Sequence, residues 1–240
     1  MKIDISEIAP AFPDFALAAV VFELGENPAE RPAALDALVA EREAECRTRH
    51  DGIELSAIPG VAAWRRAYRA FGIKKTSYRS SVERLVKNAL AERGLARVNT
   101  FVDAYNLVSL SHVLPLGADD FDKVTGDIAF RHARPDDSFR DMAAEEDGDD
   151  RPKDGEVVYA DAEKVLCRRW NWRQDARSLV TPETRRVVLT LQANGAGDLD
   201  AAVADLLDLA GRFCAARAAV TRLDAANPVA ELALPFSAAS

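Results

Sequence analysis

The sequence is poor in the residues on which most metal sites and histidine-based catalytic sites depend. It holds three cysteines and three histidines, all far apart, and contains no CxxC pair. Cysteines that are few, odd in number and widely spaced argue against a zinc site and against a disulfide framework. We therefore expect reduced thiols, a cytoplasmic location, no metal or other cofactor, and no catalytic triad built on histidine.

Long apolar runs are also missing. The run Phe15–Phe22 lies between two acidic residues and is far too short to cross a membrane, so it predicts a buried strand. No early segment combines a basic start with an apolar run, as a signal peptide would. We expect no membrane partner. With 48% hydrophobic and 29% charged residues, the chain has the composition of a globular protein.

The net charge of −8 conceals a strong segregation of charge. Residues 1–64 carry a net charge of −7, whereas residues 65–97 carry ten basic residues against two acidic ones. Such a basic segment can supply phosphate contacts on an acidic protein, and a solvated helical face is the alternative interpretation. The stretch 136–154 is acidic and predicts an exposed loop. The candidate side chains for phosphate contacts in this segment are Arg65, Arg69, Lys74, Lys75 and Arg79.

The spacing of apolar residues and the positions of glycine, proline and helix-capping residues predict helices early in the chain and strands later. We expect a strand at Phe15–Glu23, helices at Pro59–Phe71, from Ser80 onward, at Thr100–His112 and at Asp198–Ala219, and strands at 127–133, 156–161, 165–173 and 184–193. Because the two kinds of element do not alternate, the pattern favours an α+β fold over a doubly wound sheet. We divide the chain into an N-terminal strand and helix extension (1–62), a main domain (63–222) and a C-terminal tail (223–240).

The segment 165–181, VLCRRWNWRQDARSLVT, concentrates aromatic rings and hydrogen-bond donors. Read as a strand, it separates its side chains onto two faces. Donors and rings that converge on a short segment suit an anionic or planar ligand. Alternatively, both tryptophans belong to the core and the arginines reach solvent. One face would hold Leu166, Arg168, Trp170 and Trp172, and the other Cys167, Arg169, Asn171 and Arg173.

The helix expected at Thr100–His112 carries polar residues at three- and four-residue steps. Asn99, Asp103 and Asn106 recur on one side of an otherwise apolar element. A buried amide at Asn106 needs hydrogen-bond partners, either backbone groups or a ligand. Asp103 and Asp175 are possible general bases, although a carboxylate as near a helix start as Asp103 equally stabilises the helix N-terminus.

Part of the chain matches a known family. The stretch 94–123 resembles the tRNA-editing domain of the phenylalanyl-tRNA synthetase beta subunit, the B-three/B-four domain. The family's helix motif VVDxTNYV appears as FVDAYNLV at 101–108, and its turn motif QPLHAFDxDK appears as LPLGADDFDK at 114–123. CRRWNWRQ at 167–174, followed by VTPET at 180–184, looks like the free-standing branch of that family. The resemblance extends over about residues 68–192.

The resemblance implies an α+β fold with a mixed, β-sandwich-like core flanked by helices, and a cavity for an aminoacyl group. In the synthetase this cavity hydrolyses tRNA that carries the wrong amino acid. Asn106 and Pro115 match positions that line it. The family's functional histidine is Gly117 here, however, and its later acidic residue has no secure counterpart. These departures suggest a different ligand preference, or a cavity that only binds.

Two hypotheses follow. The first is an enzyme that removes the amino acid from a mischarged tRNA, and the second is a module that binds tRNA or an amino acid without turning it over. Both have tRNA, through its aminoacylated acceptor end, as partner, and in both the tRNA backbone binds the basic side chains named above in the segment 65–97. Neither the amino acid nor the oligomeric state follows from the sequence. The candidate catalytic residues are Asn106, Asn171 and Arg173, and the candidate substrate-binding residues are Asp103, Pro115, Gly117, Cys167, Arg169, Trp170, Trp172 and Gln174.

Overall fold

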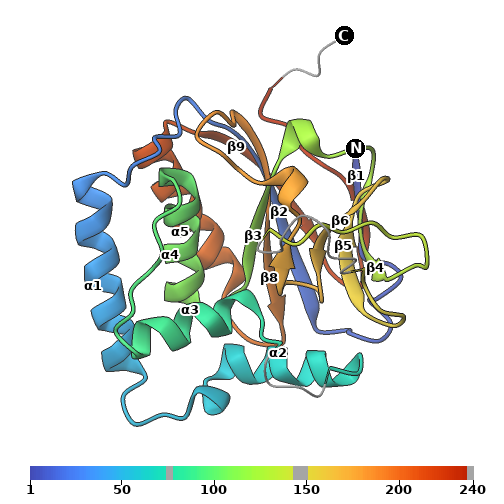
Figure 1. The fold of residues 1–240 in the computed structure, drawn as a ribbon, viewed down its shortest axis with the longest axis horizontal. Helices are drawn as coiled ribbons and strands as arrows, with labels where there is room; N and C mark the ends of the chain where they lie inside the picture. The colour runs from blue at the N-terminus through green and yellow to red at the C-terminus, as the bar shows by residue number, and fades with distance from the viewer. Residues whose placement is uncertain (74–77, 143–150, 237–240) are drawn as a thin grey trace.

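Two β-sheets lie face to face, and helices cover the outer face of one of them (Figure 1). The computed structural model describes residues 1–73, 78–142 and 151–236. The helices are α1 (Ala33–Arg49), α2 (Pro59–Ala70), α3 (Ser81–Leu90), α4 (Thr100–His112) and α5 (Leu199–Cys214), with short 3-10 helices η1 (Leu55–Ala57), η2 (Phe121–Lys123) and η3 (Ala176–Ser178). The strands are β1 (Lys2–Asp4), β2 (Phe15–Glu23), β3 (Leu116–Asp120), β4 (Ile128–His132), β5 (Val157–Ala160), β6 (Val165–Arg168), β7 (Arg173–Gln174), β8 (Arg186–Asn194), β9 (Arg217–Leu223) and β10 (Val229–Glu231).

The strands join segments that are distant in the sequence. One sheet has the order β10-β1-β4-β5-β6-β7, and the other has the order β3-β8-β2-β9. β1 runs parallel to β4, and the other neighbouring pairs are antiparallel. This places β3, which directly follows α4, beside β8 from the last third of the chain.

The strand β2 shows why the sheets and helices stack as three layers. Its residues alternate between two apolar clusters: Leu17 and Val21 face the six-stranded sheet and α2, whereas Val20 and Phe22 face α4 and α5. A strand buried on both faces reads as a continuous apolar run, and this explains the sequence of residues 15–22. Figure 1 shows α1, α3, α4 and α5 on one side of this sheet and the second sheet on the other.

Side-chain caps define the starts of the helices that border the space between the sheets. The Asn99 side chain accepts a hydrogen bond of 3.0 Å from the backbone N–H of Val102, and the Ser80 hydroxyl accepts one of 3.4 Å from that of Glu83. Both satisfy amide groups that have no partner within their own helix. α4 ends at His112, and the next residue, Val113, has a φ of 53° that turns the chain toward β3.

The fold class predicted from the sequence is confirmed: the structure is α+β, with two sheets flanked by helices. β2 and α4 have the predicted limits. The domain limits at 62/63 and 222/223 stay predictions. Residues 1–62 contribute β1 and β2, which pair with β4 and β8, and the stretch 223–240 contributes β10, which pairs with β1.

The prediction of one continuous strand at 165–173 is wrong. The strand stops after Arg168, and the chain reverses through residues 169–172 before β7 pairs with β6. Arg169 and Trp170 have φ values of 48° and 67°. Such left-handed conformations are unfavourable for most residues other than glycine, and the amino-acid types at these two positions do not indicate them. Because the segment is a hairpin, the two faces expected from strict alternation do not exist.

The last helix is also shorter than predicted. α5 ends at Cys214, Ala215 adopts a φ of 46°, and the residues expected to continue the helix form β9 against β2. The sequence there is rich in alanine and arginine and lacks a glycine or proline stop signal. β3 also begins inside the stretch that was interpreted as a turn. No helix in the described ranges is both long and apolar enough to span a membrane.

Candidate functional site

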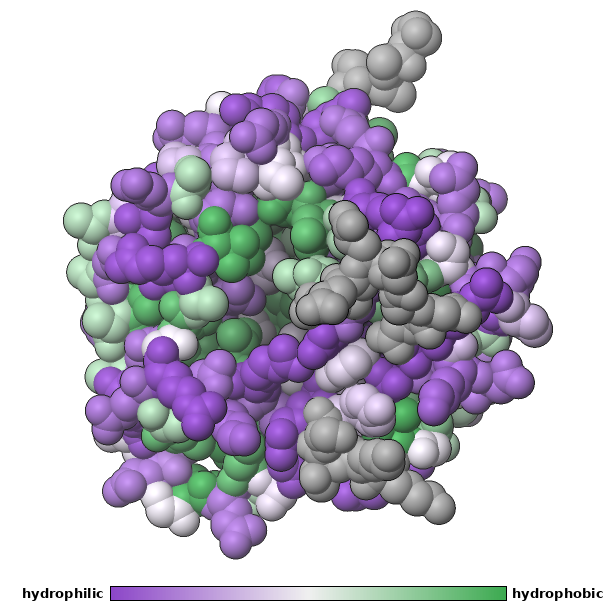
Figure 2. All heavy atoms as spheres, in the orientation of Figure 1, coloured by the Kyte–Doolittle hydropathy of each residue, from purple (hydrophilic) through white to green (hydrophobic). Residues whose placement is uncertain are grey.

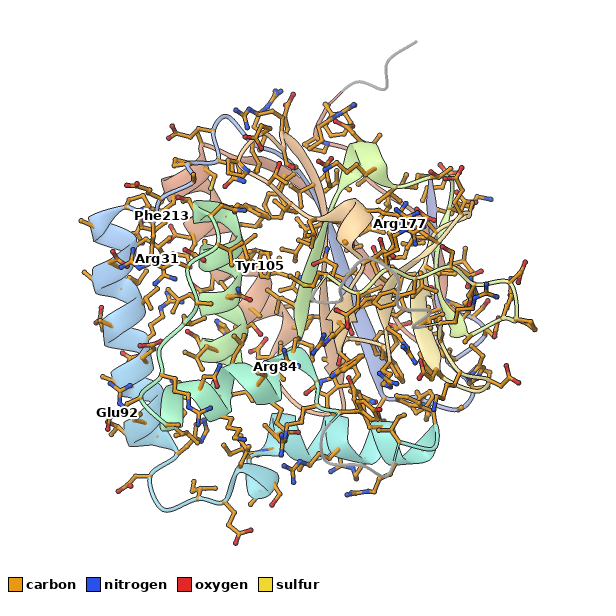
Figure 3. The ribbon with its side chains drawn as sticks, in the orientation of Figure 1. Arg31, Arg84, Glu92, Tyr105, Arg177 and Phe213 are labelled. Atoms are coloured by element: carbon orange, nitrogen blue, oxygen red, sulfur yellow. The ribbon has the colours of Figure 1, made fainter. Side chains whose placement is uncertain are left out.

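A cavity of about 310 Å³ lies between the two sheets, where β3 and β8 face β5, β6 and β7. α3 and α4 complete its wall, and Figure 3 labels Arg84 and Tyr105, which come from these two helices. On the face shown in Figure 2, apolar side chains gather around a hollow near the centre of an otherwise mainly hydrophilic surface. A concave site with apolar walls and a few polar groups is typical of small-ligand binding.

β3 contributes four of the lining residues, Leu116, Gly117, Ala118 and Asp119. Leu116 and Ala118 pack into the apolar cluster shared with α4 and α5, so Gly117 and Asp119 face the other sheet. Gly117 pairs with Thr190 of β8, which also lines the cavity. A Cβ atom added at Gly117 would have no heavy atom within 4 Å. The cavity therefore has open space at the position where related domains carry histidine.

Asp119 is a buried carboxyl group in the cavity wall and is 2% exposed. Its Oδ1 accepts hydrogen bonds of 2.9 Å from Gln174 Nε2 and 2.7 Å from Ser178 Oγ. Burial raises the pKa of Asp119 to about 7, although these two hydrogen bonds lower it. Asp119 is not among the site residues predicted from the sequence. The signal that could have found it is the turn motif of the related domains, in which phenylalanine occupies the position of Asp119.

A chain of amide groups runs along another wall. Tyr68 Oη donates to Asn171 Oδ1 at 2.9 Å, and Asn171 Nδ2 donates to Gln192 Oε1 at 3.0 Å. Gln192 Nε2 in turn donates to Thr190 Oγ1 at 3.1 Å. Asn171 lies in the reversal between β6 and β7, so the left-handed turn is what brings its amide to β8.

Several polar groups of the cavity wall have no protein partner within the described residues. The buried atoms are Tyr159 Oη, Ser81 Oγ, Trp172 Nε1 and Arg173 Nε. The half-buried Asn106 also lines the cavity, and its amide makes no hydrogen bond in the described part of the chain. Buried polar groups are nearly always hydrogen-bonded, so this group of donors and acceptors is suited to a polar ligand.

Cys167 lines the cavity as well, but its chemistry there is that of a neutral thiol. Burial raises the pKa of Cys167 far above its ordinary value. Because the thiolate is the nucleophilic form, a cysteine in this environment is inert at neutral pH. Burial likewise raises the pKa of Tyr159, so its hydroxyl stays protonated and can donate.

The structure brings together seven of the eleven residues predicted for catalysis and substrate binding. Asp103 lies outside the cavity, where its carboxylate pairs with Arg31 at 2.8 Å. Pro115 contributes a backbone carbonyl that accepts the Gln192 N–H. The seven predicted residues that line the cavity are Asn106, Gly117, Cys167, Asn171, Trp172, Arg173 and Gln174.

The remaining two predicted residues have other surroundings. Trp170 is fully buried in the core, with its ring centroid 4.7 Å from that of Phe12 and 5.2 Å from that of Trp64. The Arg169 guanidinium lies 3.8 Å above the Tyr78 ring, and its Nε is 3.1 Å from the Glu156 carboxylate. Arg169 thus borders a separate, neighbouring pocket.

The arginines predicted to bind tRNA differ in their availability. Arg65 and Arg79 both pair with the buried carboxylate of Glu83, at 2.7 and 2.8 Å. Arg69 is exposed on α2. Lys74 and Lys75 lie outside the described residues. Among the described residues, no three His, Cys, Asp or Glu side chains gather in a way that could hold a metal ion.

Comparison with known proteins identifies the family. Over 83 residues the chain is 35% identical to the phenylalanine–tRNA ligase beta subunit of Fusobacterium nucleatum subsp. nucleatum. This alignment covers 34% of this chain and 10% of that protein. The structure is similar to an N-terminal fragment of the phenylalanyl-tRNA synthetase beta-subunit from Pyrococcus horikoshii, with a TM-score of 0.44 and 12% identity over 90% of this chain and 49% of the fragment. The chain thus spans about a tenth of the curated relative and about half of the solved fragment. The B3/4 domain profile matches residues 63–196, which is more than half of the chain, and the chain therefore belongs to the B3/4 domain family.

Proposed function

We propose that this chain is a free-standing member of the family that hydrolyses the ester between an amino acid and the 3′ end of a mischarged tRNA. The observation that carries the proposal is the cavity between the sheets, in which Tyr159, Ser81 and Asn106 present polar groups that have no hydrogen-bond partner among the described residues. Hydrolysis of such an ester needs an aimed water and hydrogen-bond donors for the developing oxyanion. The tRNA enters the proposal through the relatives, which are named as tRNA ligase subunits.

The lining residues suggest a division of roles. The Asn106 amide and the protonated Tyr159 hydroxyl donate to the oxyanion. Asn171 acts through Gln192, because its own amide is occupied by that side chain and by Tyr68. The Arg173 guanidinium lies 4.8 Å from the Trp172 ring, and the two together form a wall for the aminoacyl group or the terminal adenosine.

The tRNA backbone is proposed to bind along the basic segment 65–97. Arg66 and Arg69 are exposed on α2 and can contact phosphate directly. Arg65 and Arg79 contribute less, because Glu83 already neutralises part of their charge. A cytoplasmic location, inferred from the small number of cysteines, stays a prediction.

The test is a deacylation assay with purified protein and a panel of tRNAs, each charged with a different amino acid and radiolabelled at the terminal adenosine. We expect faster loss of the amino acid from one or a few of them. Asn106→Ala and Arg173→Ala should slow this loss. Asn88→Ala on α3 and Arg212→Ala on α5 are the matched controls, since neither residue lines the cavity.

The same assay separates the enzyme from the binding module. No acceleration with any charged tRNA, together with retention of tRNA in a filter-binding measurement, would refute hydrolysis and support a module that only binds. Loss of both hydrolysis and binding would refute both functions and leave only the family fold.

A further inference from the structure

We propose that Asp119 is the general base of this cavity and takes the proton from the attacking water; the inference rests on the proposed hydrolytic function. The first reason is position. Asp119 projects from β3 into the space between the sheets, on the same strand face as Gly117. It is a carboxylate among the lining residues, and a base must lie within hydrogen-bond reach of the water that it activates.

The second reason is the way in which the carboxyl group is held. Both hydrogen bonds that Asp119 accepts end on Oδ1, from Gln174 Nε2 and Ser178 Oγ. Gln174 is itself fixed, since its amide also donates to the Ala118 carbonyl oxygen. Within the described residues no hydrogen bond reaches Oδ2, so that oxygen is left to act on a water in the cavity. A side chain locked in this way is oriented before the substrate arrives.

The groups that face Asp119 do not compete for the proton. Tyr105 of α4, Tyr159 of β5 and Cys167 of β6 have pKa values raised by burial, so all three remain neutral near pH 7. Lys164 and Asp161 lie beyond β5 and pair with each other at 2.6 Å. Arg84 of α3 and Arg173 of β7 also line the cavity, and the Arg173 guanidinium pairs with the Asp141 carboxylate at 2.6 Å.

In this setting Asp119 can exchange a proton under ordinary conditions. Burial raises the pKa of Asp119 to about 7, and this places roughly half of the molecules in the carboxylate form at neutral pH. A base with a pKa near the working pH combines a sufficient ionised fraction with a greater proton affinity than an exposed carboxylate has.

Two other carboxylates near the site are less suitable. Asp103 pairs with Arg31 and lies outside the cavity. Asp175 is fully buried, and its carboxylate is taken up by Arg177 and by the backbone N–H of Arg140. Both are bound to protein partners and so are not available to a water.

The step balances as follows. Oδ2 of the Asp119 carboxylate accepts a proton from water, the water oxygen forms a bond to the ester carbonyl carbon, and the carbonyl electrons move to its oxygen. When this tetrahedral species collapses, the bond between the carbon and the ribose oxygen breaks. The ribose oxygen takes the proton from Asp119, and the new carboxyl group of the amino acid releases its own proton to solvent. Asp119 is then ionised again.

The experiment is a single-turnover deacylation measurement between about pH 5.5 and about pH 8.5, a range that spans the pKa near which a general base should titrate. The substrate is the charged tRNA that the wild type hydrolyses fastest in the panel, and spontaneous hydrolysis is subtracted. The wild-type rate constant should rise through about pH 7 and level off. Asp119→Asn should lower the plateau by about 10²-fold or more, with unchanged tRNA affinity, and should abolish the rise.

Two further variants separate catalysis from folding. Ser178→Ala removes a hydrogen bond that favours the ionised carboxyl, so the rise should move to higher pH while the protein stays active. Asp122→Asn is the matched control, because this exposed residue lies outside the cavity and should keep the wild-type profile.

The failures are distinguishable. A wild type that hydrolyses, together with an Asp119→Asn variant that keeps the rate within about threefold and keeps the rise, would overturn the assignment of Asp119 alone, since removing a general base typically lowers the rate by about 10²-fold or more. An unshifted profile in Ser178→Ala would also count against it. A wild type without deacylation would instead overturn the proposed function on which the assignment depends.

Discussion

Replacing Asp119 by asparagine removes a buried charge while keeping the oxygen that Gln174 and Ser178 bind. The amide oxygen of asparagine can accept both hydrogen bonds, so the local geometry should persist. The substitution therefore isolates the effect of ionisation on the free energy of unfolding.

The magnitude follows from the pKa of Asp119, which burial raises from 3.8 to about 7. Each unit of this difference corresponds to about 1.4 kcal/mol between folded and unfolded states, so complete ionisation destabilises the wild type by up to about 4 kcal/mol. Because the pKa is raised in the folded state, the stabilising contribution is fully present below pH 3.8 and is lost as the pH rises through about 7.

The assay is urea denaturation of the wild type and Asp119→Asn at several pH values. At about pH 4 the two should have nearly equal free energies of unfolding, and at about pH 8 the variant should be the more stable, by up to about 4 kcal/mol. A variant that is equally stable at both values, or less stable at both, would refute the reasoning. Such a gain at the expense of activity is expected where a site holds an unfavourable charge.

In the matched control, Asp205, the pKa is shifted in the opposite direction. Asp205 is half-buried between Arg42 and His112; burial opposes its ionisation, but the hydrogen bonds from His112 and Arg42 dominate and lower the pKa of Asp205 to about 2. Its stabilising contribution is present above pH 3.8 and lost as the pH falls through about 2. Asp205→Asn should therefore reduce stability at neutral pH by about 1–2 kcal/mol, after allowance for solvent screening.

Three other changes test the geometry. Gly117→Ala should leave the free energy of unfolding unchanged or raise it by about 0.5 kcal/mol, because the added Cβ meets open space. Gly60→Ala is the contrasting variant and should destabilise the protein, because its Cβ would collide with the Val113 carbonyl oxygen; calorimetry distinguishes the two. Trp170→Ala should cost about 3–5 kcal/mol in urea denaturation, and a loss below about 1 kcal/mol would contradict its place in the core. Arg69→Glu should weaken tRNA binding and make the slope of log affinity against log salt concentration shallower by about 0.7–0.9 or more, whereas Arg212→Glu should change neither. A tRNA affinity that does not depend on salt concentration would refute the role of the basic segment.

The sequence was most informative where local signals agree with tertiary packing. The continuous apolar run at 15–22 predicts β2 because that strand is buried on both faces. The apolar spacing at 100–112 predicts α4, and the structure adds that the Asn99 side chain caps its start. The fold class follows from such elements. Their pairing does not, because the partners of β2 lie far along the chain.

The candidate site was predictable only in part, for two physical reasons. Arg169 and Trp170 adopt left-handed conformations that neither arginine nor tryptophan favours. The hairpin, and with it the position of Asn171 in the cavity wall, could therefore not be predicted from the sequence. Asp119 stands in a stretch rich in aspartates, and the alternation that turns its carboxyl toward the cavity is known only once β3 is seen to begin at Leu116. In the sequence, its departure from the turn motif of the related domains is the signal at this position.

The left-handed turn at Arg169 and Trp170 has a consequence for ligand binding. It holds Trp170 among the core rings of Phe12 and Trp64 while presenting the next residue, Asn171, to the cavity. The amide is therefore immobilised when the protein folds and not when a ligand arrives. A ligand that uses this wall forgoes the conformational entropy loss of about 0.5–1.5 kcal/mol that ordering a free side chain would require. Tight binding by a small occupant is thus compatible with a cavity of modest size.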